Sequence, residues 1–270
     1  MHIGTIGDVH ALRDRLDVPG MGFLPVNAFV VHADEPVLVD TGLPGSRAEF
    51  LDAVGSVVDL RDLAYVWLTH PDRDHLGALD AVLELAPRAR LVCTASAAGY
   101  LALGQQVPEE RIHVIAPGES LPVGGGRRLR AFRPPLYDNP MTVGFLDSGN
   151  GACVTSDCFG AMLPTADSAD AADIADLDPA AVRAGQTFWA GVDSPWVHVV
   201  DPRRFAATYE DLRRFRPGLM LGAHLPPAAD GFDGFLDLLA DLPLSTPDQL
   251  PPGDLLDRAV DDHLDRVTPR

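Results

Sequence analysis

A short segment at residues 69–77 carries a dense group of metal-ligand side chains, which few folds accommodate. It reads Thr-His-Pro-Asp-Arg-Asp-His-Leu-Gly and places two imidazoles and two carboxylates within six residues. The apolar run at 64–68 predicts a strand, and apolar residues at helical spacing after the segment predict a helix over 75–86. We expect the strand to end at His70 and the helix to begin near Asp74. The ligand-type side chains would then lie on a tight connection between two rigid elements, which favours a metal site.

The rest of the chain alternates predicted strands and helices, which is typical of an α/β protein. Residues 1–45 are predicted to be rich in strands. Short apolar runs predict further strands at 90–93, 112–115, 129–132, 142–146, 152–155 and 219–221. Helical spacing predicts helices at 95–103, 179–192, 202–215, 230–241 and 253–264. Residues 164–178, rich in Asp and Ala, are expected to form a solvated, lid-like segment.

Composition limits the classes of function. The chain has 270 residues and a formal net charge of -18, which argues against nucleic acid or an anionic membrane as partner. Three cysteines without a C-x-x-C pair indicate a reducing compartment. The N-terminus does not read as a signal peptide, and no apolar run approaches the roughly 20 residues that cross a bilayer. We therefore expect a cytoplasmic protein.

Ligand-type residues also follow two later predicted strands, at Asp157 and His224. Open α/β sheets place their sites at the carboxyl ends of strands, so these side chains are expected to converge with the first segment. The convergent residues are His70, Asp72, Asp74, His75, Asp157 and His224. They could hold two metal ions, with Asp157 bridging the pair and His224 completing the second. The alternative is that Asp72 and Asp74 are helix-capping acids and the histidine pair is incidental.

These motifs resemble those of the metallo-β-lactamase superfamily, an αββα sandwich, over residues 27–226. Val39-Asp40-Thr41-Gly42 resembles its first motif and residues 69–77 resemble its second. Hydrolases of the family carry His-x-His-x-Asp-His there, whereas Asp72 stands here in place of the middle His. An acid at this place marks the flavodiiron and oxygen-binding di-iron branch, whose Gly-Asp-Ala-Phe-Gly resembles residues 156–160, Ser-Asp-Cys-Phe-Gly. Gly-Ala-His at residues 222–224 resembles the last ligand motif.

The resemblance implies a single metallo-β-lactamase-like domain over residues 1–270, with C-terminal helices over 230–264. The family's ligand set corresponds to His70 and Asp72 for metal 1, to Asp74, His75 and His224 for metal 2, and to Asp157 for both. An acid in place of an imidazole favours iron or manganese over zinc. Asp40 is either a turn residue or a carboxylate that orients a metal ligand.

One position departs from the family pattern. The family places another histidine on metal 1, in the loop that corresponds to residues 133–141, and this chain has none there. Asp138 is the best substitute ligand and Tyr137 is the next. Either could also be an ordinary turn residue. Without a substitute, metal 1 would be weakly bound, open or absent.

Three functions are compatible with these residues. The resemblance favours an oxidoreductase whose two metal ions, iron by preference, bind or activate O2 or NO or oxidise a small molecule. The first alternative is a hydrolase of a small ester, thioester or lactone, in which a metal-bound hydroxide attacks and Asp74 doubles as ligand and general base. The second alternative is a non-catalytic metal or oxygen sensor, which the missing histidine supports.

The expected partners follow from the same resemblance. Flavodiiron reductases carry a flavodoxin domain that delivers electrons, and the chain ends too soon after His224 to include one. We therefore expect a separate electron-donor protein for the oxidoreductase. A homodimer is a further expectation.

Overall fold

The strands form two sheets in the computed structural model, which describes residues 1–104 and 107–246. The first sheet has the strand order β1-β2-β3-β4-β5-β6-β7, and the second has the order β12-β11-β10-β9-β8. The strands of the first sheet are β1 (His2–Ile6), β2 (Val9–Val18), β3 (Gly22–Val31), β4 (Val37–Val39), β5 (Tyr65–Trp67), β6 (Arg90–Cys93) and β7 (Ile112–Val114). Those of the second are β8 (Ser120–Pro122), β9 (Arg128–Phe132), β10 (Gly144–Asp147), β11 (Ala152–Ser156) and β12 (Leu219–Gly222).

Strand direction decides where the loops leave the sheets. The short, apolar strands β4, β5 and β6 pair in parallel, as do β6 and β7. Parallel strands are buried on both faces, which accounts for their nearly continuous apolar sequences. Among the described strands of the second sheet, only β11 and β12 pair in parallel. The loops after β4 and β5 therefore leave one edge of the first sheet, and those after β11 and β12 leave one edge of the second.

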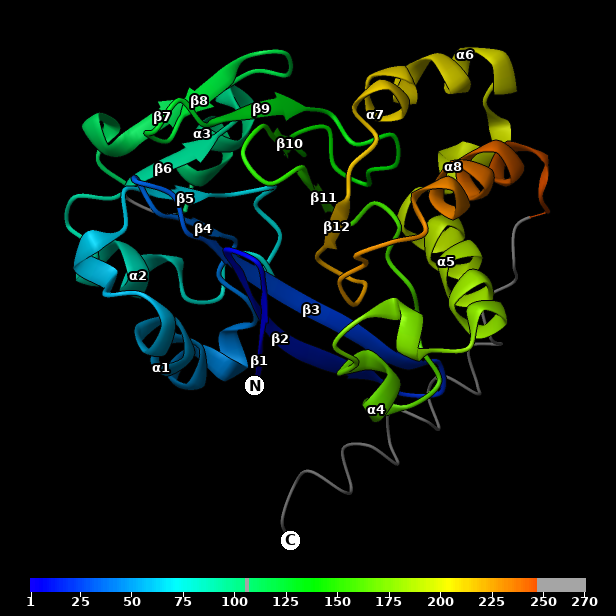
Figure 1. Cartoon of the computed structure of the whole chain (residues 1–270), viewed down its shortest axis with the longest axis horizontal. Helices are drawn as coiled ribbons and strands as arrows, with labels where there is room; N and C mark the ends of the chain where they lie inside the picture. The colour runs from blue at the N-terminus through cyan, green and yellow to red at the C-terminus, as the bar shows by residue number, and fades with distance from the viewer. Residues whose placement is uncertain (105–106, 247–270) are drawn as a thin grey trace, which may run out of the picture.

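Helices cover the outer faces of both sheets (Figure 1). They are α1 (Arg47–Val57), α2 (Leu79–Leu85), α3 (Ala95–Leu101), α4 (Ala166–Ala169), α5 (Pro179–Asp193), α6 (Pro202–Ala206), α7 (Glu210–Phe215) and α8 (Phe232–Asp241). Buried residues of α1, α2 and α3 share a core with the first sheet, and those of α5 to α8 share a core with the second. A third core lies between the sheets, where the rings of Trp67 and Phe145 are 4.8 Å apart. This αββα arrangement confirms the predicted fold class.

The helix predicted over 75–86 is shorter than expected and begins at Leu79. The residues before it are held in a turn, because the N–H groups of His75 and Leu76 both donate to the Asp72 carbonyl. Ala78 N–H then donates to a carbonyl of the loop after β4 instead of continuing a helix. The preceding strand also ends early, at Trp67. The connection that carries the ligand-type residues is therefore longer and more irregular than the sequence pattern indicated.

Two further predictions change. The helix predicted over 202–215 is divided into α6 and α7 by a 3-10 turn at Ala207–Tyr209. The segment predicted as a solvated lid at 164–178 is at least partly exposed at every residue except Ala169, as expected, but it is anchored to the first sheet, since Arg13 of β2 donates to the Asp170 carbonyl at 2.5 Å. The helix predicted over 253–264 lies outside the described residues. Among the described residues, α8 (Phe232–Asp241) corresponds to the helix predicted over 230–241.

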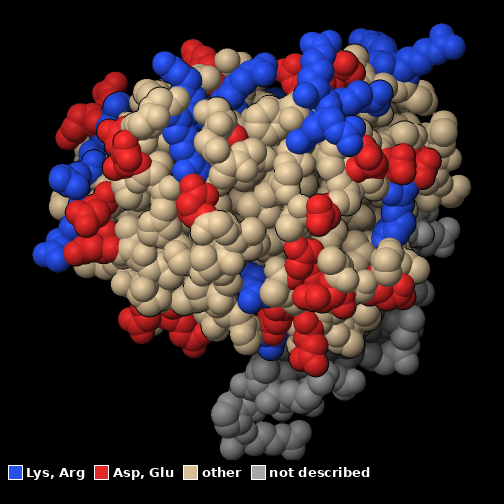
Figure 2. Space-filling model, in the orientation of Figure 1, with Lys and Arg blue, Asp and Glu red and all other residues tan. Residues whose placement is uncertain are grey.

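Carboxylates gather at the left edge and in the lower half of the visible surface (Figure 2). Arginines gather near α6 and α7 in that view. Arg203, Arg213 and Arg214 line a shallow hollow there. Glu210 forms ion pairs with two of these arginines, so the cluster is partly neutralised. In the part of the chain that the structure describes, no helix is both long and apolar enough for a transmembrane span.

Candidate metal centre

The loop after β5 buries both of its histidines. His70 and His75 are 0% and 1% exposed. The N–H of His75 donates to the Asp72 carbonyl at 3.0 Å, and the N–H of Gly77 donates to the Gly42 carbonyl at 2.8 Å. A Cβ on Gly77 would lie only 2.2 Å from that Gly42 oxygen, a distance that real Cβ atoms essentially never show. Glycine at this position therefore allows the loop after β5 to dock against the loop after β4.

Loops of the second sheet supply Asp157, which follows β11, and His224, which follows β12. Ser156, the last residue of β11, has φ of 55°, a left-handed conformation that turns the chain sharply before Asp157. The N–H of Ala223 donates to the Ser156 carbonyl at 2.8 Å and joins the two loops. The side chain of Asn27 on β3 donates to two carbonyls that flank His224 in sequence, at 3.0 and 2.7 Å. These contacts tie the second-sheet loops to the first sheet.

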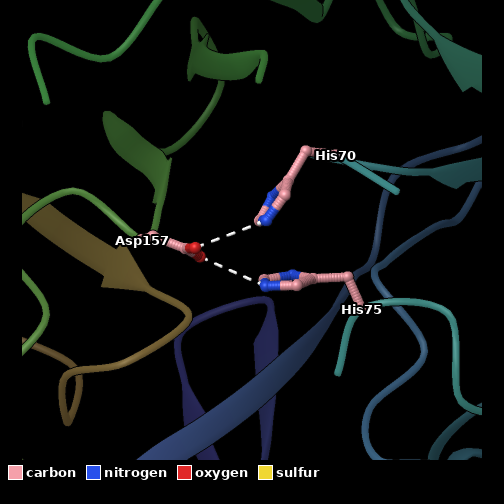
Figure 3. Close-up of side chains that lie close together, drawn as sticks. All are labelled: His70, His75 and Asp157. Atoms are coloured by element: carbon pink, nitrogen blue, oxygen red, sulfur yellow. Dashed lines mark ion pairs between the residues drawn. The ribbon is translucent and has the colours of Figure 1, made fainter. Parts of the chain in front are cut away.

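Three imidazoles face the carboxylate of Asp157, and Figure 3 shows two of them pointing toward it. Nε2 of His70 lies 3.3 Å from one carboxylate oxygen, and Nε2 of His75 and of His224 lie 3.2 and 3.3 Å from the other. Nε2 of His70 and of His75 are buried and have no hydrogen-bond partner. Buried polar atoms are rarely left unpartnered unless an ion or ligand satisfies them. The residues present therefore fit a metal ion.

The other ring nitrogen of two histidines is fixed by an oxygen that can only accept. Nδ1 of His224 lies 2.7 Å from the Pro25 carbonyl, and Nδ1 of His75 lies 2.9 Å from the Asp40 carboxylate. In the neutral form of each ring, Nδ1 therefore carries the proton and Nε2 has a lone pair for a metal. Hydrogen bonds of this kind set the tautomer and orientation of metal-binding histidines.

A chain of hydrogen bonds connects His70 to His75 on the side away from Asp157. Nδ1 of His70 lies 3.1 Å from the Ser156 hydroxyl, which donates to the Thr69 hydroxyl at 2.9 Å. The Thr69 hydroxyl donates in turn to the Asp40 carboxylate at 2.8 Å, and Asp40 also holds His75. Asp40 thus has the contacts expected of a carboxylate that orients a ligand, and its φ of 56° places it in a turn as well.

Two groups of ligand-type side chains meet at Asp157. One consists of Asp74, His75 and His224, and the other of His70, Asp72 and Asp138. Within each group the ligand atoms lie within 4.8 Å of one another. In the first group, the Asp74 carboxylate lies 3.6 Å from Nε2 of His75 and 3.4 Å from Nε2 of His224. The structure therefore brings together every residue of the predicted ligand set.

The loop that lacks the family's histidine contributes Asp138 to the group around His70. The neighbouring side chain, Asn139, donates to the Asp72 carboxylate at 3.2 Å and connects this loop to the first motif. Tyr137, the other predicted substitute, has its ring 5.1 Å from that of Trp196. The geometry therefore favours Asp138 over Tyr137 as the substitute ligand.

One carboxylate in this region was not predicted. Asp193, the last residue of α5, has an oxygen within 4.8 Å of oxygens of Asp138 and Asp157. The sequence offered only an acid between two predicted helices, without a strand end to mark it. Trp189 of the same helix donates to the Asp157 carbonyl at 3.3 Å and packs against His224 with ring centres 5.0 Å apart.

Burial and mutual charge perturb the protonation of these groups. Burial raises the pKa of Asp193 to about 7, and the charges of Asp157 and Asp138 act in the same direction. Burial opposes a charge on His224, but the carboxylate of Asp157 raises the pKa of His224 to about 9. Burial likewise opposes the charge of Asp157, and neighbouring imidazoles, His70 first, hold its pKa well below the usual range. A bound cation would replace these imidazole protons as the partner of the buried carboxylate.

Comparison with known proteins identifies the family. The sequence model of the Metallo-beta-lactamase superfamily matches residues 21–157. The chain belongs to the metallo-beta-lactamase superfamily. Its curated relatives include anaerobic nitric oxide reductase flavorubredoxins from Salmonella arizonae and Klebsiella pneumoniae, each 28% identical over 134 residues. Each match covers 50% of this chain and 28% of the relative's length.

Solved structures related to this superfamily member include flavodiiron proteins. Rubredoxin oxygen:oxidoreductase from Desulfovibrio gigas aligns with a TM-score of 0.74 at 16% identity, over 90% of this chain and 61% of that one. The Flv1 flavodiiron core from Synechocystis sp. PCC6803 aligns with a TM-score of 0.72 at 20% identity, over 89% and 61%. These alignments confirm the fold, and the flavorubredoxin matches confirm the predicted kinship with flavodiiron proteins.

Proposed function

We propose that this chain is an oxidoreductase with a dinuclear metal site, iron by preference, that binds or activates O2 or NO or oxidises a small molecule. The observation that supports this proposal is the oxygen-rich group at metal 1, where the carboxylates of Asp72 and Asp138 lie near a single imidazole, His70. Carboxylates are harder ligands than imidazoles and suit iron or manganese better than zinc. The names of the curated relatives, nitric oxide reductases, support the same class of reaction.

The proposed roles of the residues follow from their positions. His70 and Asp72, with Asp138, would hold metal 1, and Asp157 would bridge to metal 2. When bound, two redox-active ions would supply the one-electron chemistry that O2 or NO requires. The protein's part is to keep the imidazoles buried and correctly oriented, so that little reorganisation is needed on binding. The side chain of Asp72 is 44% exposed, which leaves a route for a small molecule on the metal 1 side.

Reduction of O2 or NO also needs a source of electrons. We propose that a separate one-electron donor protein supplies them, as expected from the sequence. A homodimer belongs to the same proposal. The acidic surface favours a donor that docks through a basic or neutral face.

A hydrolase is the alternative, and one observation favours it. The Asp74 carboxylate is 28% exposed and contacts both His75 and His224 at metal 2. It could therefore act both as a ligand and as the group that takes a proton from an attacking water. The sensor alternative has less support, because Asp138 places a carboxylate in the group around His70.

Metal analysis of the full chain tests the proposal. We expect protein from iron-supplemented cells to contain more iron than zinc, with about two metal ions per chain by elemental analysis. A ferric pair should also give near-ultraviolet absorption, which a zinc site lacks. The reduced protein should consume O2 or NO when it is supplied with a chemical electron donor.

A matched pair of variants separates the metal site from the fold. Asp157→Ala should lose most of its metal and its O2 or NO consumption, because it removes the carboxylate between the two groups. Asp147→Asn changes a buried carboxylate that pairs with Arg127 instead of facing the site, so its metal content should remain unchanged. One tightly held zinc ion per chain, with hydrolysis of an ester or lactone, would overturn the oxidoreductase in favour of the alternative.

A further inference from the structure

A trio of carboxylates lies beside the proposed metal 1. Oxygens of Asp138, Asp157 and Asp193 are all within 4.8 Å of one another. Carboxylates this close repel when all are ionised. An independent observation points to a cation: His70 is fully buried, and its Nε2 has no hydrogen-bond partner while facing Asp157 at 3.3 Å. The buried His70 nitrogen thus faces one member of the carboxylate trio, Asp157, and lies in one group of ligand atoms with another, Asp138.

The groups close to Asp193 do little to stabilise a negative charge on its carboxylate. It is the last residue of α5, where the negative end of the helix dipole disfavours a carboxylate. The Ser194 hydroxyl donates a hydrogen bond of 2.9 Å to the Asp193 carboxylate. Within residues 1–104 and 107–246, the carboxylate of Asp193 makes no ion pair with an arginine. A partly buried acid in this setting is costly unless a cation lies near it.

Helix α5 holds Asp193 at the site, because one face of the helix is fixed by hydrogen bonds. Gln186 donates to the Phe159 carbonyl at 3.1 Å, and Trp189 donates to the Asp157 carbonyl at 3.3 Å. Asp193 follows Gln186 by seven residues and Trp189 by four, so the three side chains share one face of the helix. That face is docked on the loop that carries Asp157. The position of Asp193 is therefore set by two hydrogen bonds before any metal binds.

We propose that Asp193 is a ligand of metal 1. The inference rests on the proposed dinuclear site and adds a residue that the family motifs do not supply. Metal 1 would then draw on two groups of ligand atoms that share Asp138: His70, Asp72 and Asp138 in one, and Asp138, Asp157 and Asp193 in the other. Metal 2 would have two imidazoles and two carboxylates. The asymmetry makes metal 1 the position that selects manganese or iron most strongly over zinc.

Titration of the metal-free full chain with Mn²⁺ tests this assignment. Calorimetry of the wild type should resolve two sites. Asp193→Asn should weaken one of them by about 10- to 100-fold, the order found when groups around a metal are removed, and leave the other unchanged. Asp138→Asn should weaken the same site. Asp178→Asn is the matched control, because it neutralises an exposed acid at the other end of α5 while an Asn can still cap the helix.

Thermal unfolding of the metal-free variants supplies a second measurement. Removing a repelled carboxylate at a helix C-terminus should leave Asp193→Asn as stable as the wild type or more stable. A merely structural role predicts the reverse, with lower stability and two unchanged Mn²⁺ sites, and that result would overturn the assignment. If the wild type binds two Mn²⁺ ions and Asp193→Asn binds both with the same affinities as the wild type, the assignment of Asp193 is also overturned. The dinuclear site would stand in that case. A wild type that binds fewer than two Mn²⁺ ions would overturn the dinuclear site and this ligand with it.

Discussion

Replacing Asp40 with asparagine should weaken metal 2 although Asp40 touches no metal in the proposed site. Its carboxylate is buried and accepts three hydrogen bonds, from the N–H and hydroxyl of Thr69, both at 2.8 Å, and from Nδ1 of His75 at 2.9 Å. An asparagine amide can keep the bond to the Thr69 N–H, and its NH2 group then faces His75. Two donors would oppose each other there, so the His75 proton would move to Nε2 and occupy the lone pair that the metal needs.

The expected loss can be given a magnitude. Replacing a group that orients a metal-binding histidine typically lowers affinity 10- to 100-fold, which corresponds to about 1.4–2.7 kcal/mol. Removing the charge from a buried acceptor also lowers the free energy of unfolding by about 1.5–3 kcal/mol. Backbone strain should not contribute, because Asn tolerates the φ of 56° at this position as well as Asp does.

Competition with a chromogenic chelator for Mn²⁺ measures the affinity, and urea unfolding of the metal-free chain measures the stability. Asp147→Asn is the control: Asp147 is a fully buried carboxylate that pairs with Arg127. Asp147 lies at the end of β10 that is far from Ser156 in the pairing with β11. The Asp147→Asn substitution should therefore lower the free energy of unfolding but leave both metal affinities unchanged. If Asp40→Asn loses stability like the control and binds Mn²⁺ like the wild type, the argument from the His75 tautomer is wrong.

Two further predictions concern the backbone around the site. Ser156→Ala removes the hydroxyl that contacts His70 but keeps a side chain at φ of 55°, so it should lower the free energy of unfolding by about 1 kcal/mol. Ser156→Gly should be more stable than Ser156→Ala by about 1 kcal/mol in urea titrations, because glycine relieves the left-handed strain; the reverse order would refute this. Gly77→Ala should destabilise by at least about 1–3 kcal/mol, since its Cβ would meet the Gly42 carbonyl at 2.2 Å. Gly234→Ala, in α8 with nothing within 4 Å of the new Cβ, should instead raise the melting temperature, with a gain of about 0.8–1 kcal/mol.

The sequence alone predicted most of the site because the ligand-type residues have local signals. His70, Asp72, Asp74 and His75 lie within six residues, and their spacing is visible without any fold. Asp157 and His224 lie far away in sequence, but each follows an apolar run that ends abruptly. Parallel strands bring their carboxyl ends together, so a strand-end rule predicts that Asp157 and His224 meet. Their meeting with the first motif also depends on the packing of the two sheets.

The tertiary structure decided what no local pattern encodes. Asp193 ends a helix instead of a strand, and it reaches Asp157 only because Gln186 and Trp189 dock α5 on the same loop. The late start of α2 has a similar cause, because hydrogen bonds to the loop after β4 compete with helical ones. The hydroxyl of Ser156 also gained its contact with His70 from the packing of the two sheets. The sequence thus determined which side chains could bind metal, and tertiary contacts between distant segments determined which carboxylates surround each position.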